Sequence, residues 1–110
     1  MYNERLLAAA ILKQAKDDYI DMRRNRTKAM KYLRMIKNGE PVPEGVTTQI
    51  CLNRIADYDQ QKLFWLTDAH IWMEYLDCDL PQDEIIEMLN SWDAIARNHH
   101  YPREGTWVYI

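Results

Sequence analysis

A run of basic side chains is the feature of this sequence best suited to a chemical task. The segment from 23 to 37 carries seven basic residues and no acidic one. These residues are Arg23, Arg24, Arg26, Lys28, Lys31, Arg34 and Lys37. Guanidinium and ammonium groups bind phosphate and carboxylate oxygens through charge-assisted hydrogen bonds. The segment is therefore a candidate contact surface for a polyanion or for a protein partner.

An acidic segment follows the basic one. The range 57–93 carries ten acidic residues against one basic residue, Lys62. Pairing of the two segments within the fold is our main interpretation. A net charge of −3 and a single aromatic residue in the basic segment, Tyr32, are unfavourable for nucleic-acid binding. Nucleic-acid binding by 23–37 is the alternative, although such domains are usually basic overall. Imitation of DNA phosphate by the acidic segment is a third reading.

Catalytic and metal-binding patterns are weak in this sequence. His70, Glu74 and Asp77 follow one another at about one helical turn, a spacing that can chelate a metal if His99 or His100 folds back. We expect His70 instead to bond a neighbouring carboxylate. No serine or cysteine has a base at a recognisable spacing, and no glycine-rich phosphate loop occurs. The sequence therefore predicts no enzyme, no metal site and no cofactor.

Large aromatic residues are numerous, and any that remain exposed would mark a protein interface. The interface candidates are Trp65, Trp72 and Trp107. Cys51 and Cys78 lack CxxC spacing and are predicted to be free, buried thiols in a reducing cytosol, with a disulfide as the alternative. The apolar run 6–12 is too short to span a membrane. We therefore expect a cytoplasmic protein with no membrane partner.

Helical periodicity dominates the chain, and glycine and proline are few. These patterns predict an all-α fold: a small helical bundle with one long N-terminal helix, two or three further helices and an extended C-terminal tail. The predicted elements of this single domain are a helix of about 3–37, a link at 38–46, a helix of about 47–77 that could break near 57–62, a helix of about 79–98 and a tail at 99–110.

The long first helix carries an apolar seam with alternating spacings of three and four residues. Its members are Leu12, Ala15, Tyr19, Met22, Arg26, Ala29, Leu33 and Ile36. A helix of this length extends roughly 50 Å at 1.5 Å per residue. Because the other helices would not readily cover such a seam, homo-oligomer formation through this helix is expected as well as binding to an unidentified protein partner.

Two short segments resemble known proteins. The segment 10–19, AILKQAKDDY, resembles the A-I-x-x-Q-A-x-x-D-Y opening of small proteins encoded by phages and prophages of Gram-positive hosts. The segment 84–92, EIIEMLNSW, is similar to their E-I-x-x-F-F-x-S-x-W segment, with Met88 and Leu89 replacing the aromatic pair and Trp92 one place early. The resemblance implies an accessory protein of a mobile element that modulates a host process or defence system through protein–protein contact.

A further likeness concerns the segment 91–97, SWDAIAR, with the tyrosine that follows it. It resembles the S-W-x-x-I-A-x-x-x-x-Y-S segment of helix-turn-helix regulators of phage late-gene control. In that motif a second helix follows and enters the major groove. Pro102 and Gly105 interrupt the corresponding stretch here. The alternative function, a nucleic-acid-binding regulator, would therefore depend on the basic segment 23–37.

Overall fold

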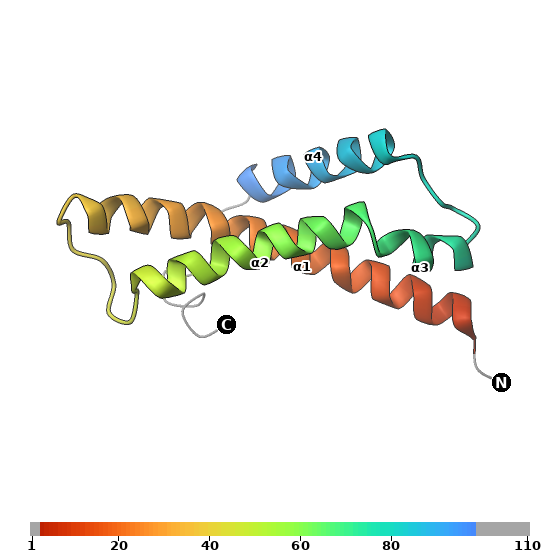
Figure 1. The fold of residues 1–110 in the computed structure, drawn as a ribbon, viewed down its shortest axis with the longest axis horizontal. Coiled ribbons are helices and arrows are strands. Elements are labelled where there is room, and N and C mark those ends of the chain that lie inside the picture. Colours follow the sequence, from red (N-terminus) through yellow and green to blue (C-terminus); the bar gives the residue numbers. More distant parts are fainter. Residues whose placement is uncertain (1–2, 99–110) are drawn as a thin grey trace.

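The computed structural model describes residues 3–98, and each regular element in that range is an α-helix. α1 spans Glu4–Lys37, α2 spans Thr48–Leu66, α3 spans Ala69–Tyr75 and α4 spans Gln82–Asn98 (Figure 1). The all-α class and the long first helix are confirmed. The predicted tail at 99–110 lies outside the described residues. Among those described, no helix has an apolar run long enough to cross a membrane.

Local sequence signals set both ends of α1. The Asn3 side chain accepts hydrogen bonds from the backbone N–H groups of Arg5 and Leu6, at 3.1 and 3.2 Å, as an N-cap does. At the other end Gly39 adopts a positive φ of 74°. The backbone N–H of Glu40 then donates to the Met35 carbonyl at 2.9 Å. This left-handed glycine closure ends the helix without a side-chain clash.

The second predicted helix breaks at a different place from the one expected. α2 continues through 57–62, so the break considered there is wrong. Asp59 and Gln60 are exposed, whereas Tyr58 and Trp65, seven positions apart, are buried on one face of the helix. Gln61 is half-buried and donates to the Ala15 carbonyl of α1 at 3.0 Å. The helix ends at Leu66 instead, where the Thr67 hydroxyl donates to the Leu63 carbonyl at 2.7 Å. α3 then forms a separate short helix.

α4 begins three residues later than predicted. Its first residue is Gln82 rather than a residue near 79. Pro81 accounts for the difference, because a proline disfavours helical backbone at the residue before it. The Pro81 carbonyl accepts the backbone N–H groups of Glu84 and Ile85, both at 3.1 Å, and so opens the first turn.

The helices pack around α1. α2 returns antiparallel to α1, α3 continues toward the N-terminal part of α1, and α4 runs back in the direction of α1 (Figure 1). α1 contacts all three other helices. The main core joins α1, α2, α3 and α4 and consists of Ala15, Tyr19, Tyr58, Trp65, Ala69, Met73, Ile85, Leu89 and Trp92. A smaller core near the 38–47 link consists of Ala29, Tyr32, Val46 and Cys51.

The other helices cover the α1 seam only in part. Ala15, Tyr19 and Ala29 are buried, and the other five predicted members are half-buried. Because these five residues keep part of their surface accessible, homo-oligomer formation through this helix stays a prediction.

Candidate functional site

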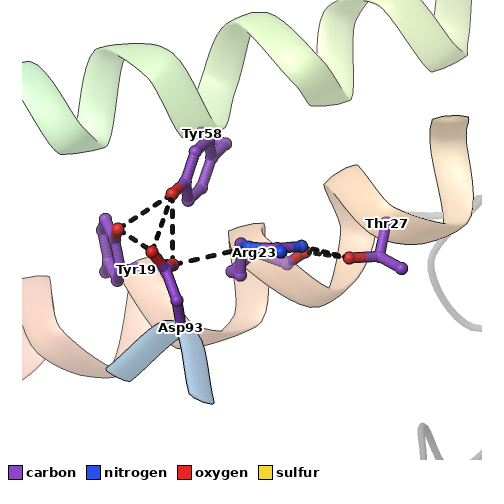
Figure 2. A network of polar contacts seen from close by, with 5 residues as sticks. All are labelled: Tyr19, Arg23, Thr27, Tyr58 and Asp93. Carbon is purple, nitrogen blue, oxygen red and sulfur yellow. Dashed lines mark hydrogen bonds and ion pairs between the residues drawn. The ribbon is translucent and has the colours of Figure 1, made fainter. Parts of the chain in front are cut away.

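A buried polar network lies at the centre of the helix packing and joins three helices (Figure 2). Asp93 of α4 accepts hydrogen bonds from the hydroxyls of Tyr19 on α1 and Tyr58 on α2, at 3.0 and 3.1 Å. The two hydroxyl oxygens are 2.9 Å apart. Arg23 Nε lies 3.5 Å from Asp93 Oδ1. The Arg23 guanidinium also bonds the Thr27 hydroxyl one turn along α1.

The surroundings of this network keep both tyrosines protonated. Burial raises the pKa of Tyr19 far above its ordinary value, and the hydrogen bonds to Tyr58 and Asp93 raise it further. Burial also raises the pKa of Tyr58, and the Asp93 carboxylate adds to the effect. Neutral hydroxyls can donate to the carboxylate. Because its polar atoms engage one another and little solvent reaches them, the network acts as a structural joint.

Two basic residues of the 23–37 segment belong to this interior. The side chains of Arg23 and Asp93 are 15% and 13% exposed, so the charge pair is largely shielded from water. The Arg26 guanidinium carbon lies 5.3 Å from the centroid of the Tyr58 ring, a distance suited to cation–π attraction. The predicted pairing of the basic segment with the acidic segment 57–93 is observed at Arg23, which meets Asp93. Arg23 and Arg26 are consequently poorly placed to contact a ligand.

Other members of the segment line a surface cleft between α1 and the C-terminal end of α4. The cleft has a volume of about 550 Å³. Its lining residues are Arg24, Thr27, Lys28, Lys31, Arg34, Ala96 and Arg97. Within residues 3–98, five basic side chains and no acidic one line it. This basic cleft can hold anionic groups through charge-assisted hydrogen bonds.

The basic residues of the cleft differ in their surroundings. Lys31, Arg34 and Arg97 are exposed, and none forms an ion pair with the described part of the chain. Arg24 lies 3.3 Å from Asp21, an acid on its own helix. Arg24 also lines a second, adjoining hollow together with Asp17 and Asp21. Acidic residues therefore stand beside one end of the basic cleft and limit the length of anion it can accept.

Lys37, the last member of the basic segment, lies in the final turn of α1. It is exposed and does not line the cleft. A cation at this position is favoured by the negative end of the helix dipole. Lys37 is therefore explained by helix stability without a ligand.

The aromatic interface candidates are divided by the structure. Trp65 is 3% exposed and packs against Trp92 with ring centroids 4.8 Å apart, so Trp65 is a core residue and the interface role predicted for it is wrong. Trp72 is half-buried beside the exposed Tyr75. Trp107 lies outside the described residues. In the described part of the chain, the predicted aromatic positions therefore form no continuous interface.

His70 bonds a carboxylate, as the sequence suggested. Its Nδ1 atom lies 2.5 Å from Asp79 Oδ1, and its Nε2 atom lies 3.3 Å from Gln82 Oε1. The hydrogen bond to Asp79 is the main cause of a raised His70 pKa. Among the residues described, no group of three potential ligands converges on a metal position. His99 and His100 fall outside that range.

Both cysteines are free thiols, as predicted, but the predicted burial is confirmed for Cys51 and wrong for Cys78. Cys51 is fully buried in the smaller core, and burial raises the pKa of its thiol. Cys78 is exposed in the connection between α3 and α4. A bond between them is absent from this structure.

Three features of the site escaped sequence reasoning. Arg97 is outside the basic segment 23–37 predicted as a contact surface, yet it lines the cleft opposite α1. Asp93 was counted as one acid among ten, although it is the acceptor at the centre of the network. Asn25 is buried at 4% exposure within a basic stretch that was expected to be solvated. Positions 93 and 97 are one helical turn apart and so share one face of α4. That spacing was the signal from which both contacts with α1 could have been predicted.

No family model, no curated protein and no solved structure matches this chain. The basic cleft and the network beside it are therefore the basis on which a function can be assigned.

Proposed function

We propose that this protein is a non-enzymatic binding protein that acts through protein–protein contact, with the basic cleft as its contact site. The observation that carries the proposal is the division of the basic segment. Arg23 is engaged in the interior with Asp93, whereas Lys31 and Arg34 stand exposed on the wall of the cleft. Exposed cations that form no ion pair with the described residues are available for a partner.

The phage-protein resemblance adds a biological setting to this proposal. An accessory protein of a phage or prophage acting in the host cytoplasm would modulate a host process or defence system by occupying a surface of a host protein. An acidic surface is the kind that complements this cleft, because charge complementarity raises the association rate and disfavours wrong partners.

Nucleic-acid binding through the same cleft is the second candidate, and the cluster of five basic residues favours it. Two observations count against it. No aromatic side chain of the described range lines the cleft, so bases have no stacking surface there. The net charge of −3 also opposes a polyanion at long range.

Affinity capture with matched variants tests the proposal. The wild type, the double variant Lys31→Glu/Arg34→Glu and the control Lys13→Glu would each be incubated with nuclease-treated lysate of a Gram-positive bacterium. Lys13 suits the control because its side chain is 82% exposed and lies outside the cleft. We expect proteins that the wild type and Lys13→Glu retain but the double variant loses. An identical set of captured proteins for all three would contradict the cleft as contact site.

A further inference from the structure

We propose that the segment bound in the basic cleft is an acidic α-helix whose carboxylates recur at intervals of three and four residues. This inference rests on the proposed function and specifies its partner. It follows from the spacing of the cations on α1, from the length of the cleft and from the acids at its end.

The cations of α1 that line the cleft form one row along the helix. Arg24, Lys28 and Lys31 are separated by four and three residues, and Lys31 and Arg34 by three. Residues at these spacings lie above one another on a helix surface, one turn or about 5.4 Å apart along the axis. The wall therefore presents positive charge with the repeat of an α-helix.

A second helix matches this repeat better than an extended chain does. Carboxylates three or four residues apart on a helix also recur about every 5.4 Å. On a strand, side chains of one face recur at about 6.7 Å, since each residue rises about 3.3 to 3.4 Å. Over three repeats the strand would be out of register by about 4 Å, whereas a helix stays in register.

The length of the row limits the ligand to a short one. From Arg24 to Arg34 the axis of α1 advances about 15 Å, at 1.5 Å per residue. Asp17 and Asp21 continue the α1 surface beyond Arg24 and would repel a longer anion. Arg97 faces the row from α4 and can pair with a carboxylate on the far side of a bound helix. A helix with about three turns of carboxylates fills this geometry.

Synthetic peptides test the inference directly. The first is a fluorescein-labelled, alanine-based peptide with four glutamates at successive spacings of four, three and four. The second has the same composition with its glutamates at every second position, which distributes them around a helix. The third replaces glutamate by glutamine. Fluorescence anisotropy at low and moderate salt would give the dissociation constants, and circular dichroism would verify that peptides and variants are folded.

We expect the first peptide to bind the wild type at least about tenfold more tightly than the second, with the glutamine peptide weakest. Lys31→Glu/Arg34→Glu should weaken binding of the first peptide at least about tenfold, since charge-assisted hydrogen bonds are lost. Arg97→Glu should weaken it as well, and Lys13→Glu should change it less than about twofold because Lys13 lies outside the cleft.

Two results would overturn the helix inference while leaving the proposed function standing. These are equal binding of the first two peptides, and binding of neither peptide by a protein whose lysate partners still depend on the cleft. A labelled DNA duplex and a single strand form the last arm. Tight DNA binding that is lost in the double variant, with a log–log salt slope near −4.5 for five neutralised phosphates, would overturn the proposed function itself.

Discussion

The basic segment of α1 has an inner side that faces the core and an outer side that lines the cleft. Both sides carry arginine, but in different roles. Arg23 and Arg24 are sequence neighbours, yet they point about 100° apart around the helix axis. Arg23 meets Asp93 in the interior, and Arg24 lines the surface cleft. The residues that lie opposite a cation therefore decide whether it stabilises the fold or can contact a partner. Composition alone cannot separate the two roles.

The largest effect should come from the acceptor on the inner side. Asp93→Ala leaves the shielded Arg23 charge without its partner and leaves the Tyr19 and Tyr58 hydroxyls without their acceptor. Removing one member of a buried ion pair costs about 3 to 5 kcal/mol of unfolding free energy. Urea denaturation would measure the loss.

A matched control for that change is Asp59→Ala, since Asp59 is exposed on α2. Its unfolding free energy should stay within about 0.5 kcal/mol of the wild type. An equal loss of unfolding free energy in both variants would contradict a stabilising role for the contacts of Asp93.

A smaller loss should follow from removing one hydroxyl of the network. Tyr19→Phe keeps the buried ring but deletes the donor to Asp93, which should lower the unfolding free energy by about 1 to 2 kcal/mol. Tyr75→Phe is the control, because Tyr75 is 44% exposed. If both variants unfold at the same urea concentration, the hydroxyl contacts add nothing beyond ring packing.

The more exposed pair His70–Asp79 can be compared with the shielded pair Arg23–Asp93. His70 bonds Asp79, and this contact raises the His70 pKa. A raised pKa stabilises the fold fully below the unfolded value of about 6.5, and the contribution disappears as pH rises through the folded value. Wild type should therefore exceed His70→Gln in stability at pH 5 by at most about 1 kcal/mol, the range of exposed pairs.

Denaturation of both proteins at several pH values between about 5 and 8 would measure this difference. The advantage of the wild type should shrink toward the alkaline end. An advantage that grew with pH would mean that neutral rather than charged His70 is the stabilising form.

The smallest effect on stability belongs to the outer side. Lys31→Glu/Arg34→Glu should alter the unfolding free energy by no more than about 0.5 kcal/mol, because both residues are exposed and form no ion pair within residues 3–98. Arg34 lies in the last turn of α1, and the loss of a cation there is offset by weaker repulsion among the neighbouring cations. The same urea titration applies. A loss as large as that of Tyr19→Phe would mean that the outer cations also support the fold, which would erase the distinction between the two sides.

Helix positions were largely predictable because their signals are local. Asn3, Gly39 and Thr47 are capping residues whose effect depends on backbone a few positions away. The misplaced break in the second helix has the opposite cause. The polar composition of 57–62 is typical of a loop. In the structure the stretch is helical and Tyr58 faces the core, where its hydroxyl contacts Tyr19 of α1.

The candidate site was predicted only in part. The basic segment was identified, but its division into inner and outer sides required the position of α4. Asp93 and Arg97 are one turn apart on that helix, and one meets Arg23 in the interior while the other lines the cleft. The spacing of Asp93 and Arg97 indicates that they share one helix face, but a single sequence does not say which residues some seventy positions away contact that face.

The sequence by itself determined the all-helical class, the extent of α1 and the presence of a concentrated positive charge, because propensity, capping and composition act over a few residues. The tertiary structure decided which arginines are buried, which acid they meet and where a cleft opens. Those outcomes depend on how the helices pack against one another, and a change in that packing would reassign every charge in the segment.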